Sequence, residues 1–149
     1  MPLTLRQAGL DDLGQLVPLF DAYRGFYGQP SDPAVSSGFL RQRIEQDQSF
    51  ILLALNALGE GVGFTQLFPS FSSVRAAPIF ILNDLFVAPH ARGQGAGAAL
   101  LREAARWARG RGASQLVLST ARDNQVAQRL YAAEGWVRDE EFFEYGLTL

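Results

Sequence analysis

The stretch of sequence that decides the fold runs from Ile79 to Arg109 and reads IFILNDLFV-APHA-RGQGAG-AALLREAARWAR. Its first nine residues are mostly apolar and predict a strand, and its last twelve have the pattern of a helix. The first N–H groups of a helix have no partner within the helix. A glycine-rich loop that leads into a helix therefore presents several donors, and the positive end of the helix dipole, to one point. The order of strand, loop and helix predicts an anion-binding site.

The residue types of the loop suit a phosphate. Glycines at 93, 95 and 97 carry no side chain that would block the backbone, and Arg92 has a planar fork of donors that matches phosphate oxygens. A P-loop would need Lys and then Ser or Thr after its last glycine, but the chain contains no lysine. A dinucleotide fingerprint would need another glycine spacing and an acidic residue after the next strand, where Ser119-Thr120 stand.

The loop instead resembles a known acetyl-CoA site. Arg92, Gly95 and Gly97, preceded by Leu85-Phe86-Val87-Ala88-Pro89, are spaced like the pyrophosphate loop of the GNAT superfamily of N-acetyltransferases. Asp123-Asn124 and the run from Leu130 to Trp136 resemble the same family further along the chain. The resemblance covers essentially the whole chain. Within the family, the sequence is similar to the members that acetylate small amines and polyamines (diamines). It implies an acetyltransferase that uses acetyl-CoA as its co-substrate.

Composition agrees with one such domain over residues 1–149. A chain of 149 residues, 48% of them hydrophobic, can bury one good core. The net charge is only −2 and the basic residues are scattered, which argues against a nucleic-acid partner. Cysteine is absent and histidine occurs once, so we expect no metal site. No run approaches the ~20 apolar residues of a membrane span, so we expect no membrane partner and a cytoplasmic protein.

The fold expected from the resemblance is an α/β GNAT fold with a mixed central sheet of about seven strands, flanked by four helices, in which parallel strands four and five are splayed apart. Patterns along the chain predict strands over residues 3–7, 50–55, 61–68, 79–87, 115–120, 136–138 and 142–149. They predict helices that begin at Asp11, with a kink or break at Pro18, at Asp32-Pro33, at Gly95 and at Asn124.

Asn83 and Asp84 are the anomaly within an apolar strand. Adjacent strand residues point to opposite faces, so something must satisfy both of these polar side chains. They could be a hydrogen-bonded structural pair. The resemblance instead places them in the cleft, at a bulge where the pantetheine arm contacts the backbone of Leu85 and Val87. Polyamine acetyltransferase-like enzymes have an acid in the place of Asn83, but an amide cannot act as a base. Deprotonation of the acceptor would fall to Asp84, to a water chain or to bulk solvent.

The resemblance also supplies roles for other residues. Tyr131 would donate a proton to the departing CoA thiolate, although a tyrosine is ordinarily a packed core aromatic. Tyr131 lies seven residues after Asn124, so both can face one ligand from the same helix. The residues assigned to the cofactor are Leu85, Phe86, Val87, Arg92, Gly93, Gln94, Gly95, Ala96, Gly97 and Asn124.

The region from Asp21 to Pro30 would wall the acceptor pocket. Its candidate substrate-binding residues are Tyr23, Arg24, Phe26 and Tyr27. Aromatic rings can hold an amine by apolar and cation–π contacts, and Arg24 would favour an acceptor that carries a carboxylate. Helix-packing residues with exposed tips are an equally good interpretation. Residues 68–73 are the candidate for the opposite wall of the acceptor pocket.

We therefore expect direct transfer of an acetyl group to a primary amine of a small molecule: an amine, a polyamine or an amino acid. The alternatives are acetylation of protein N-terminal or lysine amines, a non-catalytic acyl-CoA-binding module, and an enzyme that uses the glycine loop for ATP. The apolar run from Phe142 to Leu147 would form a strand edge that a second subunit can cover, so we expect a homodimer.

Overall fold

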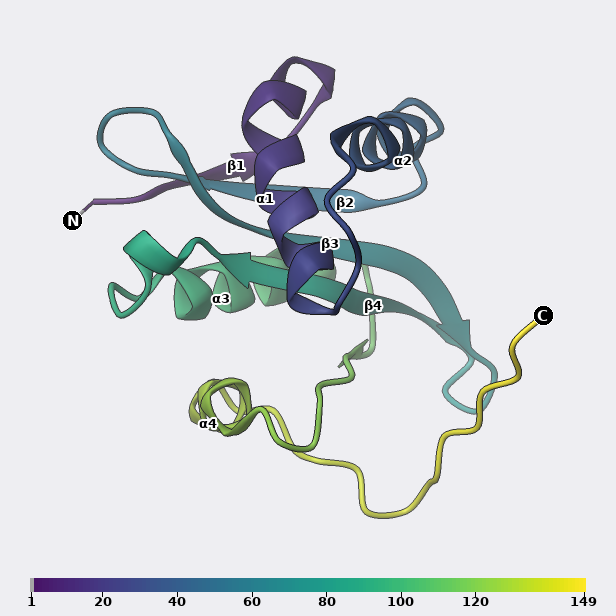
Figure 1. Cartoon of the computed structure of the whole chain (residues 1–149). Helices are drawn as coiled ribbons and strands as arrows, with labels where there is room; N and C mark the ends of the chain where they lie inside the picture. Colours follow the sequence, from purple (N-terminus) through teal and green to yellow (C-terminus); the bar gives the residue numbers. More distant parts are fainter. Residues whose placement is uncertain (1) are drawn as a thin grey trace. The chain divides into compact units, whose positions relative to one another are not determined.

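The computed structural model describes residues 2–149, and these form two compact units, one ending at Ser119 and the other running from Thr120 to Leu149 (Figure 1). The first unit contains the strands β1 (Thr4–Gln7), β2 (Phe50–Leu55), β3 (Gly61–Ser72), β4 (Ala77–Val87) and β5 (Leu116–Val117). Its helices are η1 (Leu10–Asp12), α1 (Leu13–Phe26), α2 (Pro33–Glu45), η2 (Pro89–Ala91) and α3 (Ala96–Gly110). The second unit contains α4 (Gln125–Ala133).

The strands form one mixed sheet in the order β1-β2-β3-β4-β5. The first four pair antiparallel with their neighbours, and β5 pairs parallel to β4 after the chain has passed through α3. This confirms the predicted strand–loop–helix–strand unit, with the glycine loop where α3 begins. A parallel connection of this kind needs a crossover helix, and α3 supplies it.

Both faces of the sheet are covered, which explains why all six residues of β2 are buried. Alternate residues of a strand point to opposite faces. On one face Ile51 and Leu53 join a core cluster with Phe64 and with Leu16 of α1. On the other face the ring of Trp107 in α3 stacks on Phe50, with 3.6 Å between ring centroids, and meets Phe80 edge-on at 4.7 Å. Figure 1 shows α1 crossing one face of the sheet and α3 crossing the other.

The start of α1 differs from the prediction. Asp12, not Asp11, is the residue before the helix, because η1 occupies Leu10–Asp12. Pro18 does not split the helix, which runs unbroken to Phe26. Four buried side chains, Leu13, Leu16, Leu19 and Phe20, lie on both sides of the proline in sequence and hold the helix to the sheet. The helix therefore includes Gly25 and Phe26 of the predicted acceptor-wall region.

Two other helix predictions are confirmed. Asp32 accepts a hydrogen bond from the Val35 N–H at 3.2 Å, and Pro33 is the first residue of α2. At the start of α4 the Asn124 side chain accepts from the Ala127 N–H at 3.1 Å. Both are side-chain caps of otherwise unsatisfied helix donors.

The strand predictions were wrong at two places. Residues 69–72, which lie beyond the end of the strand predicted over 61–68, continue β3 and pair with residues 77–80 of β4, because the pairing partner outweighs the turn-like composition. The sixth and seventh strands, expected at 136–138 and 142–149, are not formed, and the sheet of the described chain has five strands. An apolar, aromatic run becomes a strand only when a neighbouring strand accepts its backbone hydrogen bonds, and in the described chain that segment has no such partner. β5 is likewise shorter than predicted.

An ion pair joins β1 to the turn before α1. Both guanidinium nitrogens of the Arg6 fork donate to the Asp12 carboxylate, at 2.7 and 2.8 Å, and the Gly9 N–H donates to it at 2.8 Å. The Asp12 side chain is 11% exposed, whereas that of Arg6 is 46% exposed. The hydrogen bond from Arg6 is the largest of the effects that hold the pKa of Asp12 below its ordinary value.

We expect Asp12→Asn to lower the free energy of unfolding at pH 7 by about 1 kcal/mol, after allowance for solvent screening at Arg6, which corresponds to roughly 2–4 °C in Tm for a chain of this size. A lowered folded-state pKa contributes stability that is present above the unfolded pKa and lost as pH falls through the folded pKa. Thermal unfolding of both proteins between pH 7 and pH 3 checks this: the difference in Tm should shrink in acid. A constant difference would contradict the assigned origin of the stability.

Candidate active site

The site is organised by a β-bulge at Asn83. Leu67 of β3 pairs with Leu82 of β4, but the next residue, Gln66, pairs with Asp84, so Asn83 is left without a partner in β3. One extra residue in a strand bends it and re-aims the neighbouring side chains. This confirms the bulge that was expected at Asn83 and Asp84.

The bulge separates the two polar residues by their exposure. Asn83 is exposed, whereas Asp84 is only 2% exposed. The Gln66 amide donates to one carboxylate oxygen of Asp84 at 2.6 Å, and the Asn83 amide donates to the other at 2.8 Å. The two residues are therefore a hydrogen-bonded pair, as one of the sequence interpretations held, and they also lie together at the point where the strand is distorted.

A tyrosine of α1 reaches the same point. The Tyr23 hydroxyl donates to the main-chain carbonyl of Asn83 at 3.0 Å, and its presence there lowers the pKa of the neighbouring Asp84 carboxyl. Beneath them the Thr65 hydroxyl, which is fully buried, donates to the Asp84 carbonyl at 2.7 Å. The structure thus brings together Tyr23, Asn83 and Asp84, three residues that the sequence analysis had placed in two separate parts of the site.

Burial controls the acidity of Asp84. Desolvation, the largest effect, raises the pKa of its carboxyl above the ordinary value, and hydrogen bonds from Asn83, Gln66 and Tyr23 oppose that rise. All three of these donors are neutral, so no partner cation among them compensates the charge of an ionised carboxylate. A carboxyl with a raised pKa holds a proton more strongly than an ordinary aspartate, which suits a general base.

Sequence analysis missed Gln66 and Thr65. They stand in the middle of the apolar run GVGFTQLF, residues 61–68, at the place that pairs with Asp84 and Leu85 across the hairpin. A polar pair in each of two consecutive apolar strands was a signal that could have found them, because buried polar groups need partners. The hairpin register needed for this match was not available from the pattern alone.

The glycine loop leads directly into α3. Gly93 and Gly95 have φ values of +78° and +84°, in the left-handed region, and no atom lies within 4 Å of where a Cβ would stand on either. Gly95 is the residue before the helix and provides no side-chain cap. The first turn of α3 contains no acidic residue. The backbone of residues 93–95 is exposed, so its approach side is open, as an anion site requires.

Arg92 is tied to the end of β4. Its Nε donates to the Val87 carbonyl at 2.9 Å, and its guanidinium carbon lies 5.7 Å from the centre of the Phe86 ring. These two contacts of Arg92 hold the end of β4 to the chain that follows η2. Arg92 itself is exposed beside the loop glycines.

Between the bulge at Asn83 and the glycine loop, the edge of β4 that faces β5 is unpaired. Pairing between the strands covers only Phe80 with Leu116 and Ile81 with Val117. β4 then continues to Val87 with no further β5 residue beside it in the described structure. Unpaired strand edges carry free N–H and C=O groups, and an extended ligand can pair with them. This agrees with parallel strands that separate after a short contact.

The predicted acceptor wall lies on α1 and just beyond it. Tyr23 and Arg24 are partly buried, whereas Phe26 and Tyr27 are 60% and 52% exposed. The Tyr27 ring packs edge-on against Tyr23, with centroids 5.2 Å apart. The Nη1 atom of Arg24 is buried and has no hydrogen-bond partner. The segment from Phe68 to Ser72, predicted as an opposite wall, belongs to β3.

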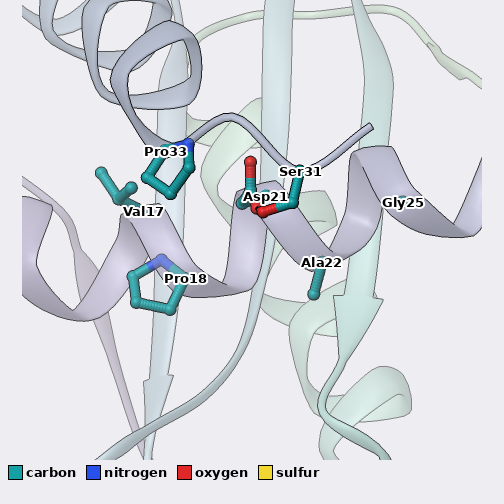
Figure 2. Close-up of a pocket in the computed structure, with 7 residues that line it drawn as sticks. All are labelled: Val17, Pro18, Asp21, Ala22, Gly25, Ser31 and Pro33. Atoms are coloured by element: carbon teal, nitrogen blue, oxygen red, sulfur yellow. The ribbon is translucent and has the colours of Figure 1, made fainter. Parts of the chain in front are cut away.

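A separate pocket of about 470 Å³ lies along another side of α1 (Figure 2). It is lined by Val17, Pro18, Asp21, Ala22, Gly25, Ser31 and Pro33. Figure 2 shows Asp21 directed toward Ser31, and its carboxylate accepts from the Ser31 and Ser36 hydroxyls at 2.6 and 2.8 Å. Asp21 thereby fastens the segment between α1 and α2. None of the lining residues belongs to β4 or to the glycine loop.

The remaining predicted residues belong to the second unit. Asn124 caps α4, and Tyr131 lies within this helix, with its ring 6.1 Å from that of Trp136. Capping uses the Asn124 side-chain oxygen, so a structural function accounts for this residue, and its side-chain amide N–H groups are left as donors for a ligand.

The single histidine, His90, lies in η2 of the first unit and is exposed.

None of the helices within residues 2–149 has both the length and the apolar composition of a membrane-spanning segment. No group of three or more histidine, aspartate or glutamate side chains in this range is arranged to hold a metal ion.

We expect Asp84→Asn to be more stable than the wild-type protein at pH 7, on the order of 1 kcal/mol or roughly 2–4 °C in Tm. A raised folded-state pKa gives stability that is present below the unfolded pKa and lost as pH rises through the folded pKa. Asparagine removes the buried charge, and Gln66 can rotate its amide to pair with the new side chain. Thermal unfolding from pH 4 to pH 8 should show a gain that grows with pH. A variant that is less stable at every pH would contradict the effect of burial.

Comparison with known proteins identifies the family of the chain. Residues 16–136 match the Acetyltransferase (GNAT) family. The chain is 46% identical over 147 residues to "Uncharacterized N-acetyltransferase YhfO" of Bacillus subtilis (strain 168), which covers 99% of this chain and 98% of that protein. It is 33% identical over 88 residues to "Aminoglycoside N(6')-acetyltransferase type 1" of Klebsiella aerogenes, 58% of each protein.

A solved structure described as that of a probable acetyltransferase superposes with a TM-score of 0.93 at 42% identity, over 98% of this chain and 97% of the other. A bulged fourth strand and a glycine loop before α3 are thus found in a chain whose sequence and fold are both those of one family. The protein belongs to the GNAT family and is an acetyltransferase.

Proposed function

We propose that this acetyltransferase moves an acetyl group from acetyl-CoA directly to the primary amine of a small molecule. The observation that carries the proposal is the pairing of an open glycine loop at the start of α3 with an unpaired edge of β4. The loop suits a diphosphate and the edge suits an extended amide chain, and coenzyme A contains both.

The residues at the loop fit the diphosphate. Backbone N–H groups from Gly93 to Gly97 would bind its oxygens, since the left-handed glycines leave the approach side open. Arg92, exposed next to them, would supply a fixed positive charge. Gln94 and Ala96 contribute backbone to the same turn.

The residues along β4 fit the pantetheine arm. Its amides would pair with the backbone around Leu85, Phe86 and Val87, where β5 no longer occupies the edge. A main-chain donor near Leu85 would stabilise the oxyanion that develops when the amine attacks the thioester. The acetyl group is then held by the strand itself, and no covalent intermediate on the protein is required.

The acceptor would approach past α1. Tyr23, Arg24, Phe26 and Tyr27 present three aromatic rings and one guanidinium, which suit an amine with an apolar stem or with a carboxylate. Similarity to an aminoglycoside acetyltransferase supports a small, amine-bearing acceptor. Polyamines and amino acids stay within the proposal, and Asp84 is the candidate base for the acceptor amine.

The test is release of free CoA thiol when the protein meets acetyl-CoA and a panel of amines: kanamycin, spermidine, lysine, and a peptide with a free N-terminus. Turnover of any of the first three supports the proposal. Turnover of the peptide alone would replace the proposal with protein acetylation.

The homodimer expected from the apolar run at residues 142–147 also remains a prediction. The exposure of Phe142 and Phe143, 77% and 90%, supports it.

The glycine loop gives the first specific prediction. Gly95→Ala places a side chain on a residue with φ +84°, a strain of about 1–2 kcal/mol. Relief of that strain would turn the loop N–H groups away, so we expect affinity for CoA to fall about tenfold, the equivalent of 1.4 kcal/mol. Isothermal calorimetry with CoA measures it. Gly110→Ala, at the other end of α3 and with open space around it, is the matched control and should keep the wild-type affinity.

Tyr131 gives the second specific prediction. The role assigned to its hydroxyl rests on the family resemblance. If its hydroxyl protonates the leaving thiolate, Tyr131→Phe should lower kcat by on the order of 10²-fold, while the Kd for acetyl-CoA stays as in the wild type. Tyr145→Phe, which removes an exposed hydroxyl near the end of the chain, is the control. Equal turnover of Tyr131→Phe and wild-type protein across the pH range would remove the role.

A further inference from the structure

Both main-chain carbonyls of the bulge are held by side-chain hydroxyls. The Asn83 carbonyl accepts from the Tyr23 hydroxyl of α1 at 3.0 Å. The Asp84 carbonyl accepts from the Thr65 hydroxyl of β3 at 2.7 Å, and these two residues are buried, with exposures of 2% and 0%. Burial of a hydroxyl is unfavourable unless it is hydrogen-bonded, and valine has nearly the same shape without that cost. A threonine at position 65 therefore has a reason beyond packing.

The ladder between β3 and β4 directs the Leu85 N–H away from β3. The Ala88 N–H donates to the Val62 carbonyl at 2.8 Å, so these two residues form a hydrogen-bonded pair. Such pairs alternate with non-hydrogen-bonded pairs along antiparallel strands, and the register makes Leu85 and Thr65 a non-hydrogen-bonded pair. The N–H and C=O groups of such a residue point to the side of the strand away from its partner. For Leu85 this is the side of β5.

The Thr65 hydrogen bond reinforces this direction. The Asp84 carbonyl and the Leu85 N–H belong to one planar, trans peptide group, in which the C=O and the N–H point in opposite directions. Because Thr65 holds the carbonyl on the β3 side, the N–H is held on the β5 side. A C=O that accepts a hydrogen bond also polarises the N–H of its own peptide group, which makes that N–H a stronger donor.

The sheet does not use the Leu85 N–H. In the described chain β5 pairs with β4 only at Phe80 and Ile81, so no strand lies beside Leu85 to accept from it. Before the bulge it is Phe80 whose N–H points to the β5 side, where it donates to the Gln115 carbonyl at 3.2 Å. The extra residue moves this outward position from even-numbered to odd-numbered residues. Leu85 is partly exposed, so a ligand can reach its backbone.

We propose that Thr65 is a positioning residue for acetyl transfer: its buried hydroxyl fixes the Asp84–Leu85 peptide group and strengthens the Leu85 N–H as the donor to the thioester oxygen. The inference rests on the proposed function. As the acceptor nitrogen forms its bond to the acetyl carbon, negative charge gathers on that oxygen, and the charge leaves it again when the C–S bond breaks. A donor that is aligned in advance needs no rearrangement while the charge develops.

The first experiment measures turnover with the best acceptor of the amine panel. Thr65→Val keeps the shape of the side chain and removes the hydroxyl, whereas Thr65→Ser keeps the hydroxyl. We expect kcat to fall roughly tenfold in Thr65→Val, less than the 10²-fold or more that loss of an oxyanion donor itself costs. The Kd for CoA should stay as in the wild type, and Thr65→Ser should recover most of the rate.

Thr4→Val, the same substitution at an exposed position of β1, is the matched control and should keep the wild-type kcat. Thermal unfolding shows whether each variant is folded, and Thr65→Ala carries the comparison if Thr65→Val is not. A folded variant without the Thr65 hydroxyl that keeps the wild-type kcat would overturn the inference.

The second experiment observes the thioester and needs no acceptor. Acetyl-CoA labelled with ¹³C at the acetyl carbonyl is bound to each protein, and its resonance is compared with that of the free compound. A donor to the carbonyl oxygen draws electron density from the carbon, so binding to the wild type should move the resonance to higher chemical shift. The displacement should be smaller in Thr65→Val and restored in Thr65→Ser. Equal displacements in wild type and Thr65→Val would show a purely structural threonine and sink the inference.

Failure of the proposed function gives different results. If the folded wild-type protein does not bind acetyl-CoA, or binds it without moving the carbonyl resonance, the proposed co-substrate or its oxyanion donor is wrong, and the inference falls with it. If the resonance moves but no amine of the panel reacts, the proposed acceptor class is wrong. The comparison of the Thr65 variants by their bound resonances then still decides whether this hydroxyl aims the Leu85 N–H.

Discussion

The inserted residue in β4 is the constraint on which the site depends. Asn83 has no partner in β3, and the residues on either side of it pair in two different registers. An uninterrupted ladder would have kept strict alternation of faces from Phe80 to Val87. With the insertion, Asp84 lies on the face of the sheet opposite to Leu82 and beside Gln66, Asn83 is exposed, and the part of β4 beyond Ile81 has no β5 residue beside it.

Packing on both faces of the sheet then determines where the remaining groups lie. Trp107, held against Phe50 and Phe80, fixes α3 on one face, and the loop glycines must lie where that helix begins. Leu16 and Phe20 fix α1 on the other face, which delivers Tyr23 to the bulge. The position of the anion site and that of the Tyr23 hydroxyl at the bulge thus follow from apolar contacts at other places along α3 and α1.

Much of this was predictable from the sequence, for identifiable reasons. The order of Ile79–Val87, the glycines and the following helix predicted the parallel unit, because each part has a strong local pattern. The bulge was expected because the family resemblance places one at the two adjacent polar residues that interrupt the apolar strand. Gln66 was missed because its function depends on the register between two strands, which no local pattern contains. The last strands were predicted from composition, yet strand formation also depends on a neighbour that composition does not supply.

Arg92 has a consequence for how a ligand would be recognised. One of its N–H groups is already committed to the Val87 carbonyl, so the plane of the guanidinium is set before any anion arrives. Less rotational freedom is then lost on association than with a freely moving cation. An ammonium group carries its donors on a single atom and could not hold the strand and present a flat pair of donors outward at once. The chain contains no lysine, and at this position the planar guanidinium with its several donors is what favours arginine.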